Sequence, residues 1–259
     1  MLKFYAKSCP NAEKIVHDFV YKHIHKSSTL PAALIRPASY GNHAEKDAVV
    51  NKSLRGFDFI NKVKSLLEAE CPGIVSCADI LALAARDSIG GPFWNVPTGR
   101  RDGLISRVSE ASTDTPVSNS NFSALITSFS SKGLDLRDLV VSSGGDKDPS
   151  LDTKYAAYLK SKKCKSPNET AIQIVMDPGS SKTFDLSYYK LVLSGRGLFQ
   201  SDAALLTNST SKALINQIIQ GSIEDYFAEF ANFMEKMGRI GVMTGSSGAI
   251  RKHCALVNG

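Results

Sequence analysis

The sequence lacks any run of about eighteen apolar residues, the length that a transmembrane helix needs, so no segment is expected to span a membrane. No signal peptide is visible, because residues 1–5 show neither a basic stretch nor the start of an apolar core. Internal repeats, low-complexity linkers and breaks in composition are absent, and strand-like alternation is rare. These absences predict one mostly α-helical domain over residues 1–259, with minimal β structure.

Positive charge is only mildly in excess, because 31 Lys and Arg residues stand against 25 Asp and Glu residues, which gives a net charge of +6. The basic residues are scattered rather than collected in a stripe, so a solvated surface explains them better than a nucleic-acid site does. The positive excess favours acidic surroundings, and an acidic polysaccharide matrix is a reasonable neighbour.

Cysteine is scarce, with five residues. All five could be buried thiols. However, one lies near each terminus, two flank a Pro-Gly turn and one stands alone, a layout typical of long-range disulfides in an oxidising compartment. Four Asn-x-Ser/Thr tripeptides, at Asn51, Asn121, Asn168 and Asn208, are also compatible with a secreted glycoprotein. The odd number leaves one cysteine over.

One stretch organises the chain, and it reads Cys71-Pro-Gly-Ile-Val-Ser-Cys-Ala-Asp-Ile-Leu-Ala-Leu-Ala-Ala-Arg-Asp87. A Pro-Gly turn separates two cysteines, and the apolar residues after the second one recur at helical spacing. Alanine and leucine favour a helix, and Gly90-Gly-Pro92 ends it. The stretch therefore predicts a tightly packed central helix. Taken alone, it is explained best as a core helix beside an ordinary disulfide.

Helical periodicity recurs through most of the remaining chain, and the predicted helices cover residues 11–26, 29–36, 57–69, 121–132, 135–141, 151–162, 187–193, 203–207, 211–220 and 222–237. Residues 90–116 are predicted to be a long irregular connection, and a small extended segment is expected around 242–250. The broad apolar stripe of residues 222–237 indicates core packing rather than a cofactor wall.

Short sequence blocks follow one another in order: Phe4-Tyr-Ala-Lys-Ser-Cys-Pro-Asn-Ala-Glu13, Glu45-Lys-Asp-Ala48, Leu54-Arg-Gly-Phe57, Gly99-Arg-Arg-Asp-Gly103, Lys132-Gly-Leu-Asp-Leu136, Asp148-Pro-Ser-Leu-Asp152, Thr183-Phe-Asp185, Ser187-Tyr-Tyr-Lys190, Gln200-Ser-Asp202, Lys236-Met-Gly238 and Thr244-Gly-Ser246. Together with the central stretch, these blocks resemble the plant secretory haem peroxidases, the class III family. The resemblance extends over nearly the whole chain.

The resemblance implies a haem-peroxidase-like helical fold and an extracellular monomer with haem b and calcium as cofactors. Its activity would be the oxidation of phenolic donors by hydrogen peroxide, with peroxide removal and oxidative stress as its setting and anionic cell-wall polysaccharide as a neighbour. The resemblance also implies the disulfides Cys9–Cys71 and Cys77–Cys254 and leaves Cys164 without its family partner. Each disulfide closes a long loop and is worth roughly 4 kcal/mol.

The distal half of the haem site is interrupted in this chain. A haem peroxidase needs a distal His that moves a proton between the peroxide oxygens and an Arg that stabilises the developing charge. Arg36 matches that catalytic Arg and Asn51 the residue that hydrogen-bonds the His, with Glu45 as a further remnant. After Pro37, however, the family's Phe-His-Asp-Cys segment is missing. His43 is the histidine nearest to this junction.

The proximal half is interrupted in the same way. The stretch Asp138-Leu-Val-Val-Ser-Ser-Gly-Gly145 leads to the place where the family has the His that ligates iron, and here it runs directly into Asp146. Asp202 matches the carboxylate that orients this His. Pro116 matches the Pro at the haem edge where aromatic donors bind. A partial calcium site also remains, which the resemblance assigns to Asp177, Ser180, Thr183 and Asp185.

The two interruptions, with their flanks intact, predict weak or no specific haem binding and little peroxidase turnover. His17, His23, His25 and His253 are expected on solvated surface. Three alternatives stay open: a non-catalytic protein of peroxidase fold, the product of a truncated transcript or gene model, and a surviving enzyme that uses His43 or holds haem without His. The missing packing would also open a cavity that costs several kcal/mol, so an unstable product is a further expectation.

Overall fold

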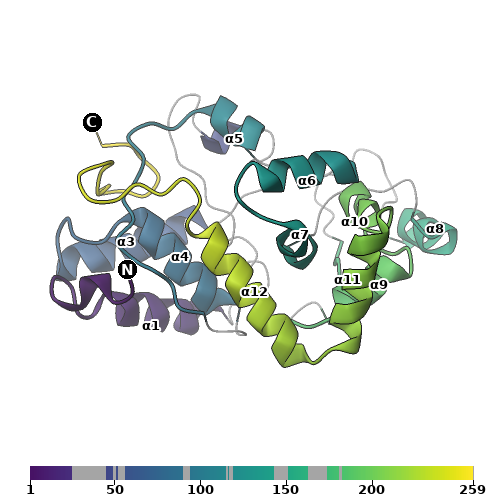
Figure 1. Ribbon diagram of the computed structural model, residues 1–259. Coiled ribbons are helices and arrows are strands. Elements are labelled where there is room, and N and C mark those ends of the chain that lie inside the picture. The colour runs from purple at the N-terminus through teal and green to yellow at the C-terminus, as the bar shows by residue number, and fades with distance from the viewer. Residues whose placement is uncertain are drawn as a thin grey trace. The chain divides into compact units, whose positions relative to one another are not determined.

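The computed structural model describes residues 1–24, 45–48, 51, 56–89, 94–114, 116, 119–142, 151–162, 174–180 and 183–258. Contacts divide the chain into two compact units, the first formed by Met1–Thr115 with Met234–Gly259 and the second by Pro116–Phe233. Each unit is described by itself. Helices are the main regular elements of both (Figure 1), which confirms the mostly α-helical prediction. The prediction of a single domain over 1–259 stays a prediction.

The first unit is built on three helices that lie side by side, α1 (Ala12–Ile24), α3 (Phe57–Glu70) and α4 (Cys77–Ser88) (Figure 1). Their apolar faces meet in a core in which every side chain is fully buried, namely Val16, Val20, Val63, Leu67, Ile80 and Leu83. Burying such a side chain stabilises the fold by about 1.5–3 kcal/mol. The unit also contains the short helices η1 (Phe4–Ala6), η2 (Glu45–Asp47) and α5 (Val108–Asp114).

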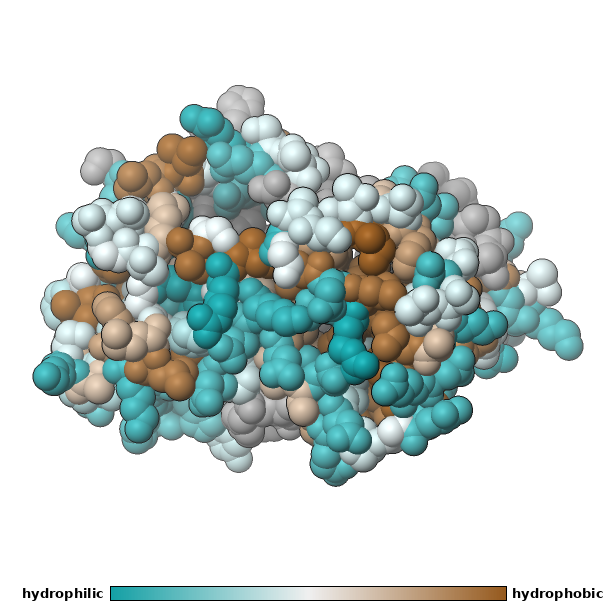
Figure 2. Space-filling model, in the orientation of Figure 1, coloured by the Kyte–Doolittle hydropathy of each residue, from teal (hydrophilic) through white to brown (hydrophobic). Residues whose placement is uncertain are grey.

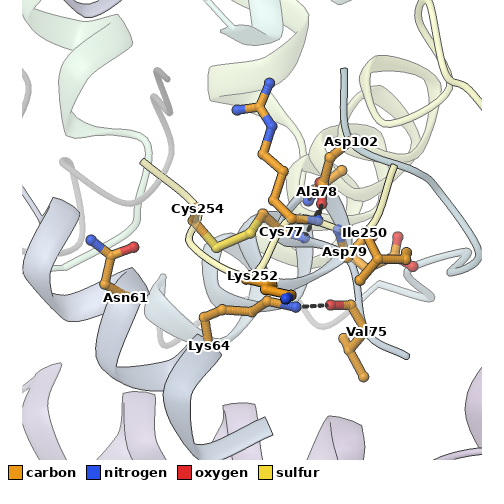
Figure 3. Close-up of a disulfide and its surroundings, with 12 residues drawn as sticks. Asn61, Lys64, Val75, Cys77, Ala78, Asp79, Asp102, Ile250, Lys252 and Cys254 are labelled. Carbon is orange, nitrogen blue, oxygen red and sulfur yellow. Dashed lines mark hydrogen bonds between the residues drawn. A yellow bond between two sulfur atoms is a disulfide. The ribbon is translucent and has the colours of Figure 1, made fainter. Parts of the chain in front are cut away.

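The first turn of the central helix α4 is held by side-chain oxygens. The Ser76 hydroxyl accepts a hydrogen bond from the Asp79 backbone N–H at 3.1 Å. The Asp102 carboxylate, which comes from the chain beyond the helix, accepts from the N–H groups of Cys77 at 3.1 Å and Ala78 at 2.8 Å (Figure 3). These groups would otherwise have no partner at a helix start, and a negative charge is favourable there. Asp102 therefore stabilises the beginning of α4.

A buried cation on α3 holds the turn that leads into α4. The Lys64 side chain is almost fully buried, and its Nζ donates to the Val75 carbonyl at 2.6 Å (Figure 3) and to Glu68 Oε1 at 2.5 Å. Because a buried charge is costly without partners, Lys64 needs both contacts, and the one to Val75 joins α3 to the segment that follows the Pro-Gly turn.

The C-terminal tail is attached to the rest of the first unit in two ways. The Cys77–Cys254 disulfide joins it to the start of α4 (Figure 3). Two isolated antiparallel bridges, Arg101 with Met243 and Asp102 with Ala249, join it to the chain after α4. The bridges confirm that residues 242–250 are partly extended, although no full strand forms within the described ranges.

The second unit consists of the short helices α6 (Phe122–Ser130), α7 (Leu136–Ser142), α8 (Thr153–Lys162), α9 (Ser187–Leu193) and α10 (Gln200–Ala204), and the longer helices α11 (Ser209–Gln220) and most of α12 (Ile223–Met237). Helix α7 contacts α6 and α11, and α11 also contacts α9. The buried residues Leu139, Tyr189, Val192, Leu205 and Ile215 form the core of this unit.

Two predictions about helices were wrong, and one lies outside the described residues. Residues 90–116 were predicted to be irregular but contain α5, whose sequence Val-Ser-Glu-Ala-Ser-Thr-Asp has too few apolar residues to show a period. Helix α10 begins at Gln200 rather than 203, because the Asp202 carboxylate accepts the Phe199 N–H and closes an earlier turn. The helix expected at 29–36 falls outside the described ranges.

Hydrophilic residues cover much of the face seen in Figure 2, and hydrophobic residues lie in smaller groups between them. Such interspersed apolar surface is ordinary for a folded protein. Among the described residues, every helix is too short or too polar to cross a bilayer.

Candidate functional site

Asp202, the carboxylate expected to orient an iron-bound histidine, lies in α10 and is fully buried. Its Oδ2 atom accepts from the Phe199 N–H at 3.1 Å, and its Oδ1 atom accepts from the Tyr188 hydroxyl at 2.7 Å. The backbone of Gly197 lies against the same side chain, since a Cβ at this position would be 2.6 Å from Asp202 Cβ. A phenol therefore donates to the carboxylate that the resemblance would assign to an imidazole.

Tyr188 belongs to a group of aromatic side chains in the second unit, whose ring contacts include Tyr189, Tyr226, Phe184 and Phe230. Burial first, and the negative charge of Asp202 second, raise the pKa of the Tyr188 hydroxyl well above its usual value. Burial also raises the pKa of Tyr189, and it raises that of Tyr226 to about 12. These phenols are protonated at neutral pH, so they can donate hydrogen bonds but none is a general base there.

The residues of the expected calcium site lie together in the segment that leads to α9. The Ser180 hydroxyl donates to Asp185 Oδ2, while Asp185 Oδ1 accepts from the Ser187 N–H at 2.7 Å. The Ser180 N–H donates to the Asp177 carbonyl at 3.2 Å, and the Thr183 N–H to the Ser180 carbonyl at 2.9 Å. Asp177 Oδ1 is buried and has no hydrogen-bond partner within the described part of the chain.

The two carboxylates of this segment have opposite pKa shifts. Burial first, and then the negative charge of Asp185, raise the pKa of Asp177. Burial also opposes ionisation of Asp185, but hydrogen bonds from Ser180 and Ser187 outweigh it and lower its pKa. Calcium prefers hard oxygen ligands, so an unpartnered carboxylate oxygen beside a second carboxylate fits this ion. Among the described residues no three Asp, Glu, His or Cys side chains cluster, so the other oxygen atoms that this segment offers are those of its serine and threonine residues.

Of the distal remnants, Glu45 and Asn51 lie in the described ranges and are in contact. The Glu45 N–H donates to the Ser106 hydroxyl at 3.1 Å, and Asn51 Nδ2 donates to the Glu45 carbonyl at 2.8 Å. The side-chain amide expected to hydrogen-bond a histidine therefore closes the η2 turn through its NH2 group. Arg36 and His43 lie outside the described residues.

The described histidines have partners of their own or are exposed. His17 Nδ1 lies 3.6 Å from Asp87 Oδ1. His23 Nδ1 lies 2.7 Å from the Phe19 carbonyl, and the His23 and Phe19 rings stack with 4.1 Å between their centroids. His253 is exposed, as expected. The prediction of a solvated surface is thus incomplete for the two histidines of α1.

Known proteins resemble this chain along nearly its whole length. A sequence model of the family described as Peroxidase matches residues 26–221. Peroxidase 3 of Arabidopsis thaliana is 51% identical over 298 residues, which cover 99% of this chain and 91% of the relative. Peroxidase 39 of the same plant is 50% identical, and the alignment covers 98% of this chain and 91% of the relative. Peroxidase 1 of Oryza sativa subsp. japonica is 42% identical, and the alignment covers 99% of this chain and 92% of the relative.

The chain belongs to the class III peroxidase family of plants. This confirms the resemblance and the fold that it implies. The alignment with Peroxidase 3 spans 298 positions, whereas this chain has 259 residues, so at least 39 aligned positions have no residue in it. The chain is therefore shorter than its relative inside the aligned region.

The structure of this family member contains the two disulfides that the resemblance implies, Cys9–Cys71 and Cys77–Cys254. Pro116 is exposed. Cys164 lies outside the described residues. Sequence reasoning missed Tyr188 as the partner of Asp202, because the two lie 14 positions apart on different helices and no periodicity links them. Tyr188 stood inside a family block, which was the only signal that could have drawn attention to it.

Proposed function

We propose that this family member keeps the peroxidase scaffold but is impaired in the haem chemistry of peroxidases. The observation that carries the proposal is the Tyr188 hydroxyl on Asp202. Haem peroxidases need a histidine–carboxylate pair that holds iron and strengthens the imidazole as a ligand. None of the five histidines of the sequence falls between Pro116 and Phe233, the unit that contains Asp202. The described residues therefore do not fit the iron ligation of a haem peroxidase.

The distal side supports the same proposal. Oxidation of a phenolic donor by hydrogen peroxide needs an acid–base group and a cation beside the peroxide oxygens. Arg36 is the proposed remnant of the cation, and the proposed loss of the distal histidine removes the acid–base group. With both histidine-bearing segments proposed to be missing, the chain has neither the iron ligand nor the acid–base group that the haem reaction requires.

Haem titration of the oxidised, refolded protein tests this proposal. We expect diffuse uptake without saturation and a Soret band that does not shift when cyanide is added, because cyanide binds to iron held in a defined site. Oxidation of guaiacol by hydrogen peroxide should not exceed that of the same amount of free haem. Peroxidase 3 of A. thaliana, prepared in the same way, is the positive control.

A saturable one-to-one complex with a cyanide-sensitive Soret band would overturn the proposal. The His43→Ala variant would then distinguish an enzyme that holds haem through His43 from one that holds haem without a histidine. Loss of the complex in His43→Ala would assign the iron ligand to His43, and its retention would mean that haem is held without this histidine.

Calcium is the second proposed ligand, held by Asp177 and Asp185 with oxygen atoms of Ser180 and Thr183. The buried, unpartnered Asp177 Oδ1 supports this site. The raised pKa of Asp177 means that its ionised form is unfavourable in the folded protein. This cost is absent below the unfolded-state pKa, grows as the pH rises toward the raised folded-state pKa, and is fully present above it. A bound cation would offset the cost.

The Asp177→Asn variant tests the calcium site. Without calcium at pH 7, the variant should be as stable as the parent or slightly more stable, because the uncharged amide avoids the unfavourable ionised carboxylate. Calcium should raise the melting temperature of the parent, as expected for a ligand of the folded state, and the variant should need about tenfold more calcium for the same rise. The matched control is Glu224→Gln, which removes an exposed carboxylate from the same unit. Equal responses of Asp177→Asn and the parent would exclude the site.

Secretion is also part of the proposal, since two long-range disulfides are typical of an oxidising compartment. Asn121 is an exposed candidate for glycosylation at the start of α6. The net charge of +6 supports an anionic cell-wall polysaccharide as neighbour.

A further inference from the structure

A pocket lies in the first unit, lined by α4, by the chain that follows it and by the last turn of α12. Its volume is about 460 Å³, within the range of roughly 300–1,000 Å³ that is usual for small-molecule sites. All of the residues that line it belong to the first unit. Asp177 and Asp202 belong to the second unit, and Glu45 and Asn51 do not line the pocket, so it is not formed by the site residues described above.

Small side chains on α4 leave room for the pocket. Its wall on this helix is one face formed by Ala78, Leu81, Ala82 and Ala85. Three of these four residues are alanines, which extend little from the helix. Met234, Glu235 and Met237 from the last turn of α12 also line the pocket.

Sulfur and aromatic groups make up much of the remaining apolar surface. Met234 and Met237 come from α12 and Met243 from the C-terminal tail, and Trp94 lies in the chain after α4. Trp94 is buried and is the single tryptophan of the sequence. Methionine side chains adapt their shape and contact the edges of aromatic rings favourably. These walls therefore suit a flat aromatic group.

Two of the charges that line the pocket are neutralised by partners. Arg100 Nη1 donates to Asp79 Oδ1 at 2.8 Å, and Arg100 Nε donates to the Gly238 carbonyl at 2.8 Å. Glu235 forms an ion pair with Arg239 at 2.5 Å. Neither Arg100 nor Glu235 therefore leaves an uncompensated charge in the pocket.

Arg101 is the remaining charge on the pocket wall. Its Nε donates to the Gly248 carbonyl at 3.3 Å, and its two terminal nitrogens have no hydrogen-bond partner among the residues that the structure describes. The pocket thus combines apolar walls with one positive charge that has donors to spare. A guanidinium group binds a carboxylate through two parallel hydrogen bonds, which makes an organic acid the complementary ligand.

We propose that this pocket binds a small aromatic carboxylic acid as its anion. The ring lies against Trp94 and the methionines, and the carboxylate binds to Arg101. The site needs neither a phenolic hydroxyl nor haem, and it is independent of the proposed function.

Binding of 2-naphthoate tests the proposal, because this acid carries no phenol and cannot be oxidised as a phenolic donor. Trp94 is the only tryptophan, so quenching of its fluorescence reports occupancy of this pocket directly. We expect saturable one-to-one quenching, with the same dissociation constant by calorimetry. The uncharged analogue 2-naphthalenemethanol should bind at least about tenfold more weakly, because it cannot pair with a guanidinium.

Three variants separate the role of charge from that of shape. Arg101→Gln should weaken the binding of 2-naphthoate at least about tenfold and leave the affinity for 2-naphthalenemethanol unchanged. Arg101→Lys, which keeps the positive charge, should bind 2-naphthoate more tightly than Arg101→Gln does. Ala82→Phe should abolish binding of both compounds by filling the pocket. Arg107→Gln is the matched control, since it removes an exposed arginine of the same unit that does not line the pocket.

Circular dichroism and a denaturant midpoint would establish that each variant is folded. Equal affinities for the acid and the alcohol, or equal effects of Arg101→Gln and Arg107→Gln, would overturn the assignment of the carboxylate to Arg101. Absence of saturable binding to the folded parent protein, or full binding to folded Ala82→Phe, would overturn the site itself.

Discussion

Replacing Asp79 by alanine is expected to lower the free energy of unfolding by about 3–5 kcal/mol, out of roughly 5–15 kcal/mol for a typical domain. Asp79 is fully buried in the first turn of α4. Its carboxylate accepts from the Tyr5 hydroxyl at 2.7 Å, the Gly99 N–H at 2.6 Å and Arg100 Nη1 at 2.8 Å. Its removal leaves a largely buried guanidinium without its carboxylate partner and a buried phenol without an acceptor for its hydroxyl.

Urea denaturation should show this loss as a lower midpoint with an unchanged slope. The matched control is Asp58→Ala, because Asp58 also lies in the first turn of its helix, α3, but is exposed. Its effect should stay within about 0.5–1 kcal/mol. The double variant Asp79→Ala/Arg100→Met should recover part of the loss, because it removes both buried charges. A loss for Asp79→Ala no larger than that for Asp58→Ala would show that the carboxylate does not support the fold.

Removal of the Cys77–Cys254 disulfide has the second large expected effect. The bond joins residues 177 positions apart, and a loop of this length is worth roughly 5 kcal/mol in the chain-entropy model, with measured losses of about 2–5 kcal/mol for native disulfides. The double variant Cys77→Ala/Cys254→Ala should therefore unfold at a much lower urea concentration. The bond also holds the tail beside α4, so amide exchange should accelerate first near the Arg101–Met243 bridge.

Two comparisons make this prediction specific. Cys9→Ala/Cys71→Ala opens a loop of only 62 positions and should cost somewhat less, because the entropy term grows with loop length. Cys164→Ala removes the cysteine that has no predicted partner and should leave the midpoint unchanged. If Cys164→Ala destabilised the protein as much as the double variants do, the assumed pairing in solution would be wrong.

Helix positions could be predicted from the sequence wherever a helix buries one face. The apolar periodicity of α1, α3, α4, α11 and α12 follows directly from their position over a core, and their predicted boundaries lie within about two residues of the observed ones over the described ranges. Helix α5 was not predicted because it has few apolar side chains to bury and is rich in serine and threonine.

The candidate site was predictable as a set of residues but not as a set of contacts. Sequence blocks identified Asp202, Asn51 and the calcium-site residues, and the family was recognisable from the same blocks. Nothing in the sequence indicated that Asp202 would accept from Tyr188, or that Asn51 would donate to the Glu45 carbonyl. Hydrogen bonds between separate segments depend on where the chain folds back, and periodicity within one helix carries no information about that.

The sequence by itself determined the family, the helical class and the scarcity of histidine, because each of these is a property of residue order alone. Only the tertiary structure decided which buried carboxylate meets which partner. Asp79 meets Tyr5 and Arg100, and Asp102 caps a helix 24 residues earlier in the chain. The tertiary structure also brings three alanines, one tryptophan and Arg101 together around one pocket. The physical reason is that a buried polar group or a cavity is defined by segments brought together from distant parts of the chain, and their free energies exist only once the core has formed.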